Sequence, residues 1–381
     1  MKDALVIILY DHPREHTTDY AQQTADYIAK RNFVVCYQEN NAKSIKEIVS
    51  EGHWYRIWEK YRKNIFFYTP IYIIPFRRFG LVVRLNCWIN IVILKTIINL
   101  SITRPAFTKK IVWLFYPKYA SIIRGFGPSY SSIYDCIDYH SEEQYTVEET
   151  LLIKTSTLVT VNSHVLYELH HKIRKDIHLV PLGFALNRFR GKRKRMTIRL
   201  SYGQPVIGYI GGINSRLDYG LLVSLIGRNP QYMFVFIGPI QTHETHELFQ
   251  KSVKPNIDAL MCLQNVRYFP SLPKRDIPNI IQKFDIGIIP YDCTRKYNSC
   301  SFPMKLFEYF YMGKPVISTP IEELKRFPKF VKTGDTAEEW EHNIKELLSK
   351  PWPRRFQKEQ RRLATQNSWE KKLFYITSLI K

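Results

Sequence analysis

Short apolar runs alternate with longer amphipathic segments along almost the whole chain, and this alternation constrains the fold more than any other feature. Strands of a parallel sheet read as continuous apolar runs, because helices cover both of their faces. The pattern therefore predicts an α/β fold built on parallel sheets. The predicted strands are residues 4–10, 33–38, 110–117, 131–140, 157–163 and 176–183, then 205–212, 232–239, 265–271, 284–291 and 314–319.

A basic, polar stretch over residues 188–204 separates the two series of strands. A chain of 381 residues is longer than a single hydrophobic core usually accommodates and suits two doubly wound domains. We expect a first domain over 1–187, a linker over 188–204, a second domain over 205–352 and a C-terminal helix over 353–381 that packs back toward the first domain. Ligands of such sheets bind beyond the carboxyl ends of the strands, so functional residues are expected in the loops there.

The charge balance is strongly basic, with 56 Lys and Arg against 34 Asp and Glu, a net +22. Such an excess favours nucleic acid, anionic lipid or phosphate-bearing substrates. The basic stretch is internal and short, which favours a solvated linker over a nucleic-acid tail, so no nucleic-acid partner is expected. The six cysteines show no short paired spacing, which favours reduced thiols over disulfides or a zinc site. We expect no metal and no cofactor.

The longest apolar stretch, residues 79–102, is interrupted by Arg84, Lys95 and three asparagines. A membrane-spanning helix needs ~20 predominantly apolar residues and central charges are costly, so the stretch predicts a buried or interfacial helix. The first apolar run lacks a small-residue cleavage site and reads as a buried strand, not a signal peptide. We therefore expect a cytoplasmic protein, attached peripherally to the inner face of the cytoplasmic membrane through its basic charge.

A glycine-rich loop follows the predicted strand at 205–212, with the sequence GYIGGINSRLDYG. Gly211 and Gly212 would let the backbone approach a phosphate, and Arg216 adds a planar cationic fork. The spacing does not match the dinucleotide fingerprint G-x-G-x-x-G. From these residues alone, a phosphate site and a tight turn with a surface arginine remain equal alternatives.

The segment FPMKLFEYFYMGKPVIST predicts a short helix that begins near Pro303 and ends at Gly313. Glu308 lies among aromatic residues, where a carboxylate is costly to bury unless it is paired. A ribose diol would pair with it through both hydroxyls. Lys305 is suited either to a phosphate or to an ion pair with Glu308 at i, i+3.

These segments resemble the nucleotide-binding domain of retaining GT-B glycosyltransferases of family four. Within that family the chain is most similar to the branch of teichuronic acid and other cell-surface polysaccharide transferases. The matching pieces are IGYIGGINSRLDYGLL, FVFIGP, NVRYFPSLPKRDIPNIIQKFDIGIIPY and SFPMKLFEYFYMGKPVIST. The first half matches more weakly, through IVWLFYP, SSIYDCIDYH, LVTVNSHVLYEL and VPLGF. The resemblance implies two Rossmann-like domains facing a central cleft.

The resemblance also implies roles for particular residues. Glu308 falls where the family's glutamate holds the ribose of a nucleotide-sugar donor, and Arg216 falls in the loop at the diphosphate. The other positions that fall in donor-contacting loops are Gly211, Gly212, Pro270, Ser271, Leu272, Pro303, Met304 and Lys305. The implied acceptor is a glycan or a lipid-linked glycan, and the implied reaction retains the anomeric configuration without a metal.

An acceptor hydroxyl needs a proton acceptor, and the donor's own phosphate is one candidate. The side-chain candidates are Asp138 and His140, at the end of the predicted strand 131–140, and Asp11 and His12, after the first strand. For Asp11 and His12, capping of a turn is the alternative role.

The chain departs from the family pattern at three places. A second glutamate of the family falls at Cys300, the lysine that follows the phosphate arginine is replaced near Asp218 and Tyr219, and a histidine of many relatives falls at Ile137. These departures leave open an inactive member of the family. With the net charge of +22, Cys300 makes a polyanion-binding protein one alternative function, and a sugar-nucleotide epimerase of the same fold is the other.

Overall fold

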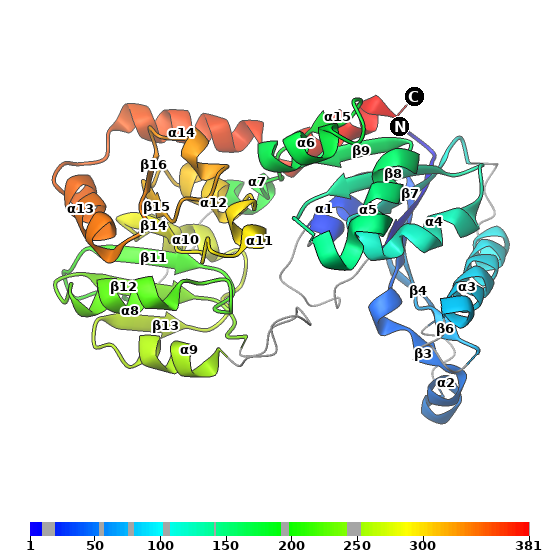
Figure 1. Ribbon diagram of the computed structural model, residues 1–381, viewed down its shortest axis with the longest axis horizontal. Coiled ribbons are helices and arrows are strands. Elements are labelled where there is room, and N and C mark those ends of the chain that lie inside the picture. The colour runs from blue at the N-terminus through cyan, green and yellow to red at the C-terminus, as the bar shows by residue number, and fades with distance from the viewer. Residues whose placement is uncertain are drawn as a thin grey trace. The chain divides into compact units, whose positions relative to one another are not determined.

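The protein is described from a computed structural model, in which the chain forms two compact units. The first unit contains Met1–Pro181 and Trp369–Lys381, and the second contains Leu182–Ser368. The described residues are 1–9, 20–52, 57–74, 80–101, 107–140, 142–191, 198–241 and 253–380. Each unit is an α/β structure around a mainly parallel sheet, which confirms the predicted fold class (Figure 1).

The sheet of the first unit has eight strands in the order β10-β9-β8-β7-β1-β2-β5-β4. All neighbours pair in parallel except β4, which is antiparallel to β5. The strands are β1 (Leu5–Leu9), β2 (Phe33–Tyr37), β4 (Trp58–Arg62), β5 (Ile65–Tyr68), β7 (Lys110–Leu114), β8 (Ser131–Cys136), β9 (Leu158–Val161) and β10 (His178–Leu179). The six strands predicted for this half are confirmed. The polar strand β4 was not predicted, because an edge strand of alternating charge carries no apolar run.

Helices cover this sheet, and a small second sheet stands beside it. The helices are α1 (Tyr20–Ile28), α2 (Ile45–Glu51), α3 (Gly80–Ser101), α4 (Ala120–Phe126), α5 (Glu142–Thr155), α6 (His164–His171) and α15 (Trp369–Leu379). The small sheet pairs β3 (Lys43–Ser44) with β6 (Ile71–Tyr72). A capping box begins α2, because Ser44 and Glu47 satisfy each other's backbone N–H groups.

The C-terminal segment corrects one prediction. Residues 353–381 form two helices, α14 (Arg354–Gln366) and α15, and only α15 belongs to the first unit. A buried ion pair holds α15 to the sheet, since Lys372 Nζ lies 3.2 Å from the Asp135 carboxylate and both side chains are at most 2% exposed. Asp135 also accepts a hydrogen bond of 2.7 Å from Thr160. Helix α15 thereby joins strands β8 and β9, beside which it lies in Figure 1.

The second unit has a six-stranded parallel sheet in the order β13-β12-β11-β14-β15-β16. Its strands are β11 (Val206–Ile210), β12 (Met233–Ile237), β13 (Val266–Phe269), β14 (Ile286–Ile289), β15 (Val316–Ser318) and β16 (Val331–Thr333). Its helices are α7 (Leu186–Arg190), α8 (Tyr219–Gly227), α9 (Lys254–Met261), α10 (Ile277–Gln282), α11 (Lys296–Ser299), α12 (Lys305–Tyr311), α13 (Ala337–Leu348) and α14. The five predicted strands are confirmed, and the strand order reverses between β11 and β14, which is where such sheets bind ligands.

The predicted linker does not separate the two units. The chain passes between them at Pro181–Leu182 and again at Ser368–Trp369. Within the predicted linker, Leu200 is 3% exposed in the core of the second unit, and Arg267 donates to the Arg199 carbonyl at 3.0 Å. The described part of this stretch therefore packs as a segment of the second unit.

Helix α3 shows why the interrupted apolar stretch keeps its asparagines. Asn86 Oδ1 accepts from the backbone N of Ile73 and of Ile74, each at 3.0 Å, and Asn90 Oδ1 accepts from Ile71 N at 2.7 Å. The two buried amides thus hydrogen-bond the backbone of Ile71–Ile74. By length and composition α3 is the one candidate membrane span among the described residues, with a mean hydropathy of 1.8 and 28% of that window buried.

Candidate functional site

Two loops approach each other closely at the carboxyl edge of the second sheet. Gly211, just after β11, has a φ of 140°, and Gly238, just after β12, has a φ of 147°. A Cβ added to Gly238 would lie 2.1 Å from the Gly211 carbonyl oxygen. Only glycine fits this approach, because both the conformation and the space exclude a side chain. The glycine-rich loop therefore packs closely against the loop that follows β12 and is not an isolated turn.

The amine of Lys305, at the start of α12, lies against Gly211. A Cβ added to Gly211 would be 2.7 Å from Lys305 Nζ, which lies 3.8 Å from the ring centre of Tyr209 and 4.9 Å from that of Tyr291. Burial lowers the pKa of Lys305, Tyr291 raises it, and the positive charge of Arg216 lowers it further. The structure therefore holds this cation directly over the glycine loop.

Arg216 shares the Tyr291 ring with Lys305. Its guanidinium carbon lies 4.5 Å from the ring centre of Tyr291 and 4.6 Å from that of Tyr297. Arg216 Nε donates to Asn298 Oδ1 at 3.0 Å, and Asn298, 1% exposed, donates in turn to the Asp292 carbonyl at 2.9 Å. Two cations are thus fixed on one aromatic ring, and anion binding is the chemistry that such an arrangement suits.

Helix α12 is anchored to the central strand through Tyr309. Its hydroxyl accepts from Ile210 N at 3.1 Å and donates to the Gly208 carbonyl at 3.3 Å. The neighbouring side chains of Leu306, Phe307 and Phe310 are buried, whereas Glu308 is half-buried. The other predicted donor residues of this segment, Pro303 and Met304, are buried and half-buried respectively.

The remaining donor candidates lie after β13, two strands from β11. Ser271 is exposed and Leu272 packs partly on the core. Gly238 N donates to the Phe269 carbonyl at 3.1 Å, which ties this loop to the glycine edge. All described donor candidates therefore occupy the carboxyl edge of one sheet.

The proton-acceptor candidates belong to the first unit. Asp138 and His140 follow β8, and the His140 ring meets the Tyr116 ring edge-on at 5.8 Å. Asp11 and His12 lie outside the described residues. Two of the three departures from the family pattern are buried side chains, since Ile137 is 3% and Cys300 is 5% exposed. Burial raises the pKa of the Cys300 thiol, so it cannot supply the charge of a glutamate.

Four site residues were not predicted, namely Tyr209, Tyr291, Tyr297 and Asn298. Tyr291 had a usable signal, because it follows the apolar run FDIGIIP at a strand's carboxyl end. Asn298 and Tyr297 lie in the short helix α11, and their link to Arg216 spans about eighty residues of sequence. No local pattern indicates such a contact.

Comparison with known proteins finds a match to a protein family in the second unit. Residues 204–350 match the family model of glycosyl transferases group 1. Over 187 residues the chain is 27% identical to a Bacillus subtilis (strain 168) protein named as a teichuronic acid biosynthesis glycosyltransferase, TuaH. That alignment covers 48% of this chain and 45% of the relative, so the chain spans less than half of the length of TuaH.

Solved structures match the whole chain. Sucrose-phosphate synthase from Thermosynechococcus elongatus has a TM-score of 0.72 at 12% identity, covering 100% of this chain and 98% of that one. Anabaena HepE in complex with UDP has a TM-score of 0.67 at 14% identity, covering 100% and 99%. The OtsA apo structure has a TM-score of 0.71 at 10% identity, covering 100% and 99%. At these identities the likeness concerns the fold, which is GT-B.

Proposed function

We propose that this chain, which contains a group 1 glycosyl transferase domain at residues 204–350 and has the GT-B fold, transfers a sugar from a nucleotide-diphosphate-sugar donor. The proposed acceptor is a glycan or a lipid-linked glycan in cell-surface polysaccharide biosynthesis. The similarity to TuaH, named for teichuronic acid biosynthesis, supports this acceptor class. UDP complexes of the similarly folded HepE support a nucleotide donor.

The observation that carries the proposal is the pair of cations on Tyr291. Breaking a glycosidic phosphate ester leaves a nucleoside diphosphate, and fixed cations stabilise that developing charge without reorganising. Asn298 contacts Arg216 and Tyr209 contacts Lys305, at an edge where Gly211 has no side chain. An anion beside Lys305 would also offset the burial that lowers its pKa.

Glu308 is the proposed ribose ligand. Replacing it by alanine is expected to weaken binding of the nucleoside diphosphate about 10- to 100-fold, because hydrogen bonds to a charged group are worth about 1.5–3 kcal/mol. Calorimetric titration with UDP, GDP, CDP and their sugars measures this. Glu322→Ala is the matched control, since Glu322 forms an exposed pair with Lys325 at 2.7 Å.

Two results of this titration would contradict the proposal. Absence of any nucleotide binding to the wild type removes the transferase and the epimerase alike. Equal binding by the Glu308→Ala variant removes the ribose assignment alone. Sugar transfer to an added glycan, as opposed to interconversion of the free nucleotide sugar, separates the transferase from the epimerase.

The chemical step is proposed to proceed with retention and without a metal, as the resemblance implies. The proposed proton acceptors are Asp138, His140, Asp11, His12 and the donor's own phosphate. The anomeric configuration of the first-formed product, read by NMR, tests retention directly. An inverted product would reject it.

A peripheral membrane location is proposed from α3 and its surroundings. Trp88, Leu81 and Leu100 expose 57%, 79% and 78% of their surface on this helix. Arg84 on the same helix and Lys46 on α2 are exposed as well. Exposed apolar and basic residues on these helices suit an anionic membrane surface, where each basic residue is worth about 1 kcal/mol.

Vesicle flotation tests the membrane proposal. The wild type is expected to float with anionic vesicles and to be released by salt, and Trp88→Glu is expected to weaken binding about tenfold or more. Phe374→Glu is the control, because Phe374 is 68% exposed on a different helix, α15. Indifference to lipid charge, or equal loss in both variants, would reject α3 as the membrane contact.

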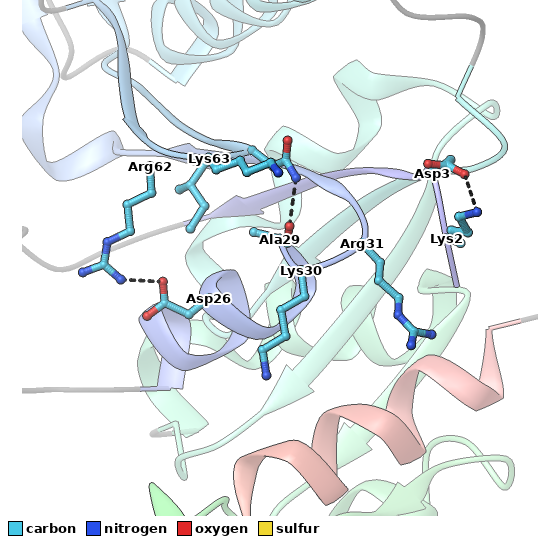
Figure 2. A pocket seen from close by; sticks show the side chains of 10 residues that line it. Lys2, Asp3, Asp26, Ala29, Lys30, Arg31, Arg62 and Lys63 are labelled. Atoms are coloured by element: carbon cyan, nitrogen blue, oxygen red, sulfur yellow. Dashed lines mark hydrogen bonds and ion pairs between the residues drawn. The ribbon is translucent and has the colours of Figure 1, made fainter. Parts of the chain in front are cut away.

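A polyanion-binding protein remains a second candidate, and a basic hollow in the first unit favours it. This hollow has a volume of about 980 Å³ and lies at the amino edge of the sheet. Figure 2 shows the side chains that line it. The basic residues that line it are Lys2, Lys30, Arg31, Arg62 and Lys63, with two acidic residues, Asp3 and Asp26. Binding of inorganic polyphosphate by a wild type that binds no nucleotide would favour this function.

A further inference from the structure

A compact set of metal-binding side chains lies in the first unit, outside the donor site. Cys136 ends β8, Glu149 lies in the middle of α5 and His170 lies near the end of α6. Cys136 Sγ is 3.5 Å from His170 Nε2 and 3.6 Å from Glu149 Oε1, and the last two atoms are 3.4 Å apart. His140 adds a fourth side chain, because its ligand atom lies within 4.8 Å of those of Cys136 and Glu149.

These separations are those of atoms bound to one tetrahedral ion. Zinc binds thiolate sulfur at about 2.3 Å and imidazole nitrogen or carboxylate oxygen at about 2.0–2.2 Å, which sets neighbouring ligand atoms about 3.3–3.6 Å apart. The three measured distances fall in that interval. The fold thus already holds three ligand atoms, those of Cys136, Glu149 and His170, at the spacing of a tetrahedral zinc site.

The cluster is deeply buried. His170 is 2% exposed, and its Nδ1 has no hydrogen-bond partner among the residues that the structure describes, so the ring is oriented through Nε2 toward the thiol and the carboxylate. Tyr134, fully buried, donates a hydrogen bond of 2.7 Å to Glu149 Oε1 and so helps to orient the carboxylate. A second partner of this kind is typical of metal ligands.

Charge also favours a cation here. A thiolate and a carboxylate together balance a divalent ion, so the occupied cluster is neutral and its burial costs little.

We propose that Cys136, Glu149, His170 and His140 bind a structural zinc ion in the first unit. As a zinc ligand His140 cannot also accept the proton of the acceptor hydroxyl, so with zinc bound the proton-acceptor candidates are Asp138, Asp11, His12 and the donor's phosphate. On binding, the Cys136 thiol loses its proton to solvent and forms the Zn–S bond, with no change of oxidation state. The ion would join β8, α5 and α6, which otherwise meet through hydrogen bonds and packing. His140 is half-buried and marks the side from which the ion enters. The donor site belongs to the other unit, so the ion is not part of its anion-binding set.

Metal analysis of the full-length chain, purified without chelator from zinc-supplemented cells, tests the proposal. The expected content is about one zinc per chain, lost in Cys136→Ser and reduced in affinity at least about tenfold in His140→Ala. Cys300→Ser is the matched control, because Cys300 is a buried thiol of the second unit and is expected to leave the zinc content unchanged. Cobalt substitution is expected to give the intense visible bands of a tetrahedral site and a sulfur-to-cobalt charge-transfer band.

Several results would overturn the proposal. These are a wild type without zinc that also fails to take up cobalt, a zinc content that survives in both variants, and a weak octahedral cobalt spectrum. If Cys136→Ser does not fold, the half-buried His140→Ala still decides the outcome. Nucleotide titration of the chelated protein separates this proposal from the proposed function, because loss of zinc is expected to lower the melting temperature and to leave nucleotide affinity unchanged.

Discussion

Replacement of Arg216 by alanine is expected to lower the rate of sugar transfer about 100- to 1,000-fold. The loss follows from removing one fixed donor from the charge that develops on the leaving diphosphate. Because Asn298 and Tyr291 hold the guanidinium in place, its contribution requires no ordering during the reaction. Release of nucleoside diphosphate, measured with the sugar nucleotide that binds in the titration, gives the ratio of kcat/KM.

Two further variants make this result specific. Arg216→Lys keeps the charge but loses the planar fork and the stacking, so an intermediate loss is expected. Arg228→Ala is the matched control, because Arg228 follows α8 at the opposite edge of the sheet and pairs with Glu338 and Glu341 on the surface. An Arg216→Ala variant as active as Arg228→Ala would show that Arg216 only stacks in the loop.

Replacement of Lys372 by alanine is expected to lower the free energy of unfolding of the first unit by about 3–5 kcal/mol. The reason is that the Asp135 carboxylate, fully buried, would lose the cation 3.2 Å away. Chemical denaturation of the full chain, followed by signals from the first unit, measures the change. The adjacent exposed residue supplies the control, since Lys371→Ala is expected to change stability by no more than about 0.5 kcal/mol.

The double variant Asp135→Asn with Lys372→Met distinguishes an unpaired charge from lost packing. It is expected to recover much of the stability, because it leaves no buried ion without a partner. Failure to recover any stability would assign the effect of Lys372→Ala to the aliphatic part of its side chain and contradict the ion-pair argument.

The sheets could be predicted from the sequence because buried parallel strands are apolar throughout. The strands absent from the prediction are β3, β4, β5, β6 and β16. Strand β4 is an exposed polar edge, β3, β6 and β16 have only two or three residues, and β5 and β6 lie in a stretch interrupted by prolines. The division into units was less predictable. In the sequence, residues 182–190 look like the end of the first half. In the structure they belong to the second unit, where the ring centres of Phe184 and Phe189 lie 5.4 and 5.7 Å from that of Tyr311.

The candidate site also contains residues that could be predicted and residues that could not. Gly211, Arg216 and Lys305 were visible as residue types in loops after strands. The structure places Arg216 and Lys305 on one ring, with Gly211 beside Lys305. That ring, Tyr291, and the amide of Asn298 depend on contacts between distant segments. The cysteine–histidine–glutamate cluster was missed for a similar reason, because only Cys136 and His140 lie close in sequence, and the cluster as a whole spreads over residues 136–170.

The assignment of α15 to the first unit has a consequence for synthesis on the ribosome. The second unit is one continuous segment, Leu182–Ser368, and can fold as soon as it has been made. The first unit, although begun earlier, lacks Trp369, Leu373 and Ile376 of its core until the end of α15 has been translated. The second unit is therefore the first that can reach its native state. Until α15 has been translated, the apolar surface of the first unit that α15 covers stays accessible to chaperones.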